Sequence, residues 1–126
     1  MVLVQFCLGG IDLYGEIDAC FSPDEKQSII RWIYDQQVVP NGEGTNILHC
    51  GFKGGPFMTI RKTDDTVYEY SNCANLAATY SALACLAILG DDFSRVNRDA
   101  IIGALKHLQM PNGRQVSART SKAGIE

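Results

Sequence analysis

The clearest secondary-structure signal in the chain is a helix that begins at Ser22-Pro23-Asp24-Glu25. Serine is a favoured N-cap, proline is tolerated at the first helical position, and a glutamate three residues after the cap completes a capping box. Apolar residues then follow at helical spacing, with Ile29-Ile30 and Ile33 on one face. Pro40-Asn41-Gly42 ends the pattern. These features predict a helix over residues 24–38.

Three further segments carry helical patterns. Leu76 to Leu89 is apolar around most of its circumference and meets Gly90, a residue typical of the position after a helix. Asn97 is a good N-cap for the next segment, and Val2 to Leu8 resembles the end of a helix that closes at Gly9-Gly10. The glycine-rich stretch 42–71 reads as a long irregular loop, with few strand signals. We therefore predict four helices, near residues 2–9, 24–38, 73–89 and 97–109, and a disordered tail over 114–126.

The chain contains an internal repeat. The segment from Ile29 through Gln37 to Pro40-Asn41-Gly42 matches the segment from Ile101 through Gln109 to Pro111-Asn112-Gly113 with an offset of 72 residues before the glutamine and 71 after it. A second helix precedes each copy and carries Cys-Leu in its last turns, as Cys7-Leu8 and as Cys85-Leu86. Helix pairs of this kind bury their apolar faces by stacking on neighbouring copies, and about three copies are normally needed. We expect either self-association or a piece of a longer repeat protein, and the uncapped front favours the piece.

Composition and charge narrow the class of protein. The 126 residues are 46% hydrophobic and 20% charged, with a net charge of -3, as in an ordinary globular protein. No basic stripe with interleaved aromatic residues is present, so nucleic-acid binding is not expected. The five cysteines are widely spaced and form no C-x-x-C pair, which favours free thiols in a reducing compartment. No segment reaches the roughly 20 apolar residues that a membrane span needs, and the N-terminal run lacks the features of a signal peptide, so we expect a cytoplasmic protein.

Several short segments resemble the β subunits of protein prenyltransferases. Cys50-Gly51-Phe52-Lys53-Gly54 and Asn75-Leu76-Ala77-Ala78-Thr79-Tyr80 are similar to a repeated family pattern in which Gly-Phe-x-Gly precedes Thr-Tyr. The most specific part is Leu89-Gly90-Asp91-Asp92-Phe93-Ser94-Arg95-Val96-Asn97, which resembles the geranylgeranyltransferase type I β subunit. The resemblance covers about residues 2–113. It implies an all-α fold, a partial α-α toroid in which paired helices form two concentric rings around an apolar funnel.

The resemblance also implies an activity for the intact family. These enzymes move a geranylgeranyl group from its diphosphate to a C-terminal cysteine thiol of CaaX-box proteins, pair with an α subunit, and use zinc to hold the thiolate. The zinc ligands and the basic diphosphate cluster belong to later repeats, so we expect that this chain binds no zinc, has no catalytic residue and is inactive by itself. The predicted organisation is an incomplete toroid domain over 1–113 and a tail over 114–126 that departs from the family.

Four residues are candidates for contact with substrate. In the resemblance, Phe6, Tyr80 and Ser81 line the inner funnel where the lipid and the CaaX peptide meet, although plain helix packing explains them equally well. Asn75 stands where the family has a histidine, which puts the recognition role of that position in doubt. Two other function classes stay open: a non-catalytic interaction module, and the β subunit of a farnesyltransferase or of a Rab geranylgeranyltransferase.

Other polar residues are better explained by structure than by chemistry. His49-Cys50 lacks further ligands at metal-binding spacing and is assigned to the loop and core. His107 lies near a helix C-terminus, where a histidine interacts favourably with the helix dipole. The pair Asp91-Asp92 follows a helix-ending glycine and is interpreted as a solvated turn.

Overall fold

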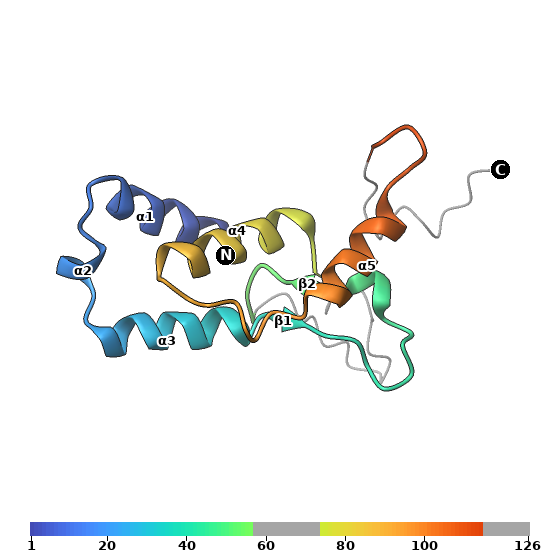
Figure 1. Cartoon of the computed structure of the whole chain (residues 1–126), viewed down its shortest axis with the longest axis horizontal. Helices are drawn as coiled ribbons and strands as arrows, with labels where there is room; N and C mark the ends of the chain where they lie inside the picture. Colours follow the sequence, from blue (N-terminus) through green and yellow to red (C-terminus); the bar gives the residue numbers. More distant parts are fainter. Residues whose placement is uncertain (57–73, 115–126) are drawn as a thin grey trace, which may run out of the picture.

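The computed structural model describes residues 1–56 and 74–114, and helices make up most of this part of the chain (Figure 1). A two-residue β-ladder is the one sheet within these ranges. The all-α fold class is thus confirmed. In chain order the elements are α1 (Val2–Leu13), α2 (Ile17–Cys20), α3 (Pro23–Tyr34), β1 (Gln37–Val38), the 3₁₀ turn η1 (Ile47–His49), β2 (Gly51–Phe52), α4 (Leu76–Ile88) and α5 (Arg98–Leu108).

Side-chain caps begin three of the helices, as expected for polar residues that satisfy free backbone N–H groups. The Ser22 hydroxyl accepts from the Glu25 backbone N–H at 3.3 Å, and the Glu25 carboxylate accepts from the Ser22 N–H at 2.9 Å. Asn75 accepts from the Ala78 N–H at 2.8 Å at the start of α4. Asn97 starts α5 in the same way. The capping box predicted for α3 is therefore confirmed.

The predicted ends of two helices are wrong. Helix α1 does not close at Gly9-Gly10 but continues to Leu13, and the chain then turns at Gly15, whose φ is +71°. Helix α3 ends at Tyr34, four residues before the predicted end. Gln37 and Val38 leave the helix because they pair antiparallel with Phe52 and Gly51. Hydrogen bonds to a distant strand thus replace the last helical turn that the local pattern favoured.

The loop predicted over 42–71 contains short regular elements. Its described part, residues 42–56, includes η1 and β2, so the prediction of an entirely irregular segment is wrong there. Residues 57–71 lie outside the described part of the chain. Helix α4 begins at Leu76, whereas the predicted start was residue 73, because Asn75 is extended and caps it. Of the predicted tail over 114–126, residues 115–126 also lie outside the described part.

The core forms where three helices meet the β-ladder. Helices α1 and α4 lie side by side, and α3 runs along the same cluster (Figure 1). The largest side chains that are fully buried include Phe52 from β2, Ile33 from α3, and Cys85 and Leu86 from α4. In the described ranges no helix is long and apolar enough to cross a membrane.

Candidate functional site

Helices α1 and α4 leave aromatic side chains uncovered. Phe6 on α1 is 66% exposed and Tyr80 on α4 is 64% exposed, which is unusual for large apolar residues on helices that otherwise form the core. Leu3 on α1 and Leu76 on α4 are also exposed. Leu3 and Phe6 are three residues apart, and Leu76 and Tyr80 are four apart, so each pair lies on one face of its helix. We call these four exposed residues of two adjoining helices the apolar wall.

A hydrogen bond between α1 and α4 fixes the position of one helix along the axis of the other. The Ser81 hydroxyl donates to the Gln5 side-chain oxygen at 3.1 Å. Because Gln5 and Ser81 are the chain neighbours of Phe6 and Tyr80, the two aromatic residues lie within about one helical turn of the same height. Ser81 itself is only 2% exposed. The structure thus assigns Ser81 to the contact between the helices, while Phe6 and Tyr80 remain accessible.

Asn75 directly precedes Leu76 and caps helix α4. Its side-chain oxygen holds the Ala78 N–H, and its backbone carbonyl accepts from the Thr79 hydroxyl at 2.9 Å. Both interactions fix the first turn of α4. The side-chain acceptor is thus committed to the helix start, which gives Asn75 a structural function whatever else it contacts.

A buried hydrogen bond joins the Gly-Phe and Thr-Tyr segments of the family pattern. The Thr79 hydroxyl accepts from the Phe52 backbone N–H at 3.0 Å, which ties β2 to α4. Gly51 permits this approach: its φ is +135°, and an added Cβ would lie 2.7 Å from the Thr79 hydroxyl oxygen. A residue with a side chain fits neither the backbone conformation nor the space. Gly51, Phe52 and Thr79 therefore position α4.

A second polar cluster joins α3 to the turn between α4 and α5. The Tyr34 hydroxyl donates to the Asp91 carboxylate at 2.5 Å, and the Arg95 guanidinium carbon lies 4.1 Å from the centre of the Tyr34 ring. Burial, followed by the hydrogen bond to Asp91 and its negative charge, raises the pKa of Tyr34 above its ordinary value. Asp91 also accepts from the Phe93 N–H. The acidic turn is therefore held to α3 through Asp91. Asp91 is only half-exposed, so the prediction that Asp91-Asp92 forms a solvated turn is wrong for this residue.

Gln37 reinforces this junction. Its side chain donates to the Arg95 carbonyl at 3.1 Å and accepts from the Asn97 N–H at 2.8 Å, so one amide orders the residues that lead into α5. Neither Gln37 nor Gln5 was singled out as functional from the sequence. For Gln37 the repeat gave a signal, because Gln109 occupies the matching position of the second copy. Gln5 has no comparable signal.

The described residues do not supply a zinc site. No group of three or more His, Cys, Asp or Glu side chains in residues 1–56 and 74–114 is arranged to hold a metal ion, so these residues do not fit the zinc that the family implies. Burial raises the pKa of the Cys50 and Cys85 thiols, which keeps them neutral and poorly nucleophilic. His49 Nδ1 is buried without a hydrogen-bond partner in the described structure, and the His107 ring contacts the Gly103 carbonyl at 2.9 Å.

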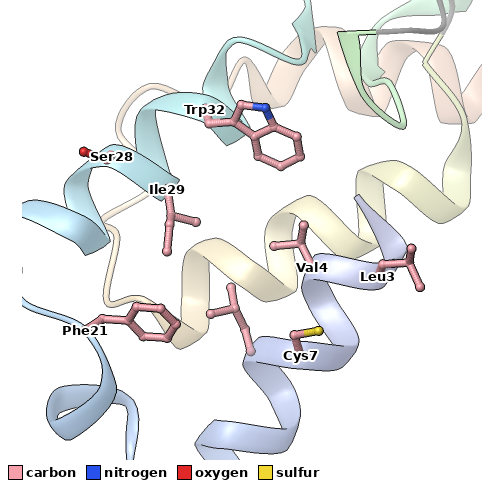
Figure 2. A pocket seen from close by; sticks show the side chains of 8 residues that line it. Leu3, Val4, Cys7, Phe21, Ser28, Ile29 and Trp32 are labelled. Atoms are coloured by element: carbon pink, nitrogen blue, oxygen red, sulfur yellow. The ribbon is translucent and has the colours of Figure 1, made fainter.

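An apolar groove of about 520 Å³ opens between α1 and α3. Figure 2 shows Ile29 and Trp32 from α3 on one side, with Val4 and Cys7 from α1 on the other. Ser28 is the one polar residue in a lining that is otherwise apolar or carries a thiol. This groove was not predicted from the sequence.

Comparison with known proteins agrees with this architecture. The sequence matches the prenyltransferase alpha-alpha toroid domain over residues 1–123. It is 34% identical over 125 residues to the geranylgeranyl transferase type-1 subunit beta of Dictyostelium discoideum, covering 91% of this chain and 35% of that protein. It is 25% identical over 117 residues to the Arabidopsis thaliana protein of the same name, covering 90% and 29%. The chain thus spans about a third of the length of these relatives. It belongs to the prenyltransferase α-α toroid family.

Proposed function

We propose that this chain forms part of the β subunit of a protein geranylgeranyltransferase type I, with α1 and α4 contributing to the wall along which the isoprenoid chain lies. The names of the two relatives support this assignment. The observation that carries it is the exposure of Phe6 and Tyr80 at one level of two adjoining helices. Apolar walls with few polar groups suit a long hydrocarbon chain, and aromatic side chains supply large contact areas.

Within this proposal the four candidate residues have different roles. Phe6 and Tyr80 contact the isoprenoid directly. Ser81 acts as a positioning residue, because its hydroxyl holds Gln5 and thereby the relative height of α1 and α4. Asn75 positions the first turn of α4.

The complete enzyme transfers the geranylgeranyl group to a C-terminal cysteine of a CaaX-box protein, pairs with an α subunit in the cytoplasm, and holds zinc in repeats outside this chain. The described residues offer neither a metal-ligand set nor a basic cluster that would stabilise the departing diphosphate. We therefore expect this chain to bind the lipid weakly and to catalyse no transfer by itself.

Binding of a fluorescent geranylgeranyl diphosphate analogue to the 126-residue chain tests the wall. Tyr80→Ala and Phe6→Ala should each weaken binding by about 10- to 150-fold, since a lost aromatic contact removes roughly 1.5–3 kcal/mol. Tyr14→Ala is the matched control, because Tyr14 is 85% exposed but lies in the turn beyond α1. Competition by inorganic diphosphate separates binding of the head group from binding of the lipid. Equal affinities for all three variants would refute the proposed wall.

A transfer assay tests the expected inactivity. The chain is mixed with an α subunit, zinc, labelled geranylgeranyl diphosphate and a CaaX peptide that ends in leucine. We expect no product above a control without enzyme, and product when the chain is extended by the remaining repeats. Turnover by the chain as it stands would contradict this expectation.

A further inference from the structure

Helix α1 carries a single amide side chain in an otherwise apolar stretch. From Val2 to Ile11, Gln5 is the one residue with an amide, hydroxyl or charged side chain. It is half-buried, and its side-chain oxygen accepts from the Ser81 hydroxyl of α4 at 3.1 Å. Burying part of an amide costs free energy unless its polar atoms find partners. The oxygen of Gln5 has such a partner in α4.

The nitrogen of the same amide is open. Among the residues that the structure describes, Gln5 Nε2 donates no hydrogen bond. The buried side-chain atoms without a partner are Gln36 Oε1 and His49 Nδ1, so the Gln5 nitrogen is not sealed from solvent. A side-chain amide is planar and carries its two N–H donors on the side away from its oxygen. The hydrogen bond from Ser81 therefore holds the Gln5 amide so that two free donors face away from that contact.

These donors lie between two helices that are both part of the chain. The bond from Ser81 to Gln5 crosses the contact between α1 and α4, which lie side by side (Figure 1). The helix that neighbours α1 on this side is thus present, and further repeats would add to the array elsewhere. Gln5 directly precedes Phe6, and Ser81 directly follows Tyr80. The open donors therefore lie at the level of the aromatic residues of the apolar wall.

We propose that Gln5 Nε2 donates a hydrogen bond to a backbone carbonyl of the peptide substrate, at the point where the peptide passes the isoprenoid on the apolar wall. The inference rests on the proposed function, because it requires the isoprenoid to lie along that wall. The hydrocarbon part of an isoprenoid offers no hydrogen-bond acceptor. A peptide carries a carbonyl acceptor at every residue. Gln5 would therefore distinguish the peptide from the lipid.

Charge favours a neutral carbonyl over the anionic groups of the two substrates. Neither α1 nor α4 contains Lys, Arg or His. A carboxylate or a diphosphate brought against these helices would lose hydration without gaining a cation, which costs far more than the same burial of a neutral carbonyl. One amide donor satisfies one carbonyl. The chemistry of the two helices thus assigns the donor to the peptide main chain.

Steady-state kinetics of the complete enzyme, with the remaining repeats and the α subunit, test this assignment. Gln5→Glu keeps an oxygen that accepts from Ser81 but removes the donor. The KM for a CaaX peptide should rise about tenfold, while kcat and the KM for geranylgeranyl diphosphate stay within about twofold. Gln5→Met removes the donor without adding a charge and should raise the peptide KM at least as much. Gln27→Glu is the matched control on the exposed surface of α3 and should change neither KM.

A merely structural role of Gln5 predicts a different pattern. Ser81→Ala breaks the bond between the helices and should raise the KM of lipid and peptide together. The proposal is overturned if Gln5→Glu behaves in this way, or if it leaves the peptide KM unchanged. A peptide with a C-terminal carboxamide identifies the acceptor: Gln5→Glu should raise its KM by the same factor. An effect confined to the free carboxylate would overturn the assignment to a carbonyl.

Phe6→Ala separates this inference from the proposed function, which requires that this variant raise the KM for geranylgeranyl diphosphate. If Phe6→Ala does so while Gln5→Glu leaves the peptide KM unchanged, only the role of Gln5 is refuted. If Phe6→Ala leaves the lipid KM unchanged, the proposed function is refuted, and the role of Gln5 with it.

Discussion

Removing the Tyr34 hydroxyl should destabilise the chain by breaking its link between α3 and the turn after α4. Tyr34→Phe deletes the donor of the 2.5 Å hydrogen bond to Asp91 but keeps an aromatic ring beneath the Arg95 guanidinium. Tyr34 is only 6% exposed, so water cannot easily replace the lost partner. A hydrogen bond to a charged group contributes about 1.5–3 kcal/mol, and we expect the free energy of unfolding to fall by that amount.

A double-mutant cycle in urea measures this interaction. Tyr34→Phe and Asp91→Asn are compared singly and together, and a coupling energy of at least about 1 kcal/mol is expected for residues in direct contact. Tyr14→Phe serves as a control because the Tyr14 side chain is 85% exposed, and its effect should stay within about 0.5 kcal/mol. Strictly additive effects of the two substitutions would refute the assignment of Tyr34 and Asp91 as an energetic link.

Three further predictions concern pH and backbone geometry. The folded state raises the pKa of Tyr34 above its ordinary value of 10.0. The stability that the neutral phenol provides is therefore present below pH 10 and is lost as pH rises through the folded-state pKa. Tyr34→Phe should flatten this alkaline decline of the melting temperature. The hydrogen bonds from Ser22 lower the pKa of Glu25, so their stabilisation is present above the ordinary value of 4.5 and is lost as pH falls through the folded-state pKa. Ser22→Ala should weaken the loss of stability at acid pH, and an unchanged profile of stability against pH would contradict the capping box. Gly51→Ala should cost about 1–3 kcal/mol in urea unfolding, whereas Gly55→Ala, with no atom within 4 Å of the added Cβ, should change stability by less than about 1 kcal/mol.

Local chemistry was sufficient to predict where α3 and α5 begin. Ser22 and Asn97 each accept a hydrogen bond from a backbone N–H at a helix start, an interaction within three residues of sequence. Asn75 caps α4 in the same way, but it was not recognised as a cap, and that helix was predicted to begin at residue 73. Because capping involves only near neighbours, the sequence pattern contains all the information required. The family resemblance likewise depended on short segments, and it predicted the toroid fold.

The ends of α1 and α3 depended on distant contacts. The Gly9-Gly10 pair favours a helix end in isolation, yet α1 continues through it while lying against α4. The local pattern allowed α3 to run to residue 38, but pairing with Gly51–Phe52 withdrew Gln37–Val38 from the helix. Intrinsic preferences of about 1 kcal/mol per residue are readily overridden by tertiary packing, so these boundaries were not predictable locally.

The sequence by itself determined the starts of α3 and α5, the repeat and the family of this protein, and through the family it pointed to Phe6, Tyr80, Ser81 and Asn75. Only the tertiary structure divided those four into two accessible aromatic residues and two positioning residues, because exposure depends on which helices pack together. The tertiary structure also decided the close approach of Gly51 to Thr79, the hydrogen bond between Tyr34 and Asp91, and the groove between α1 and α3. Each joins residues far apart in the chain, and no local spacing encodes that proximity.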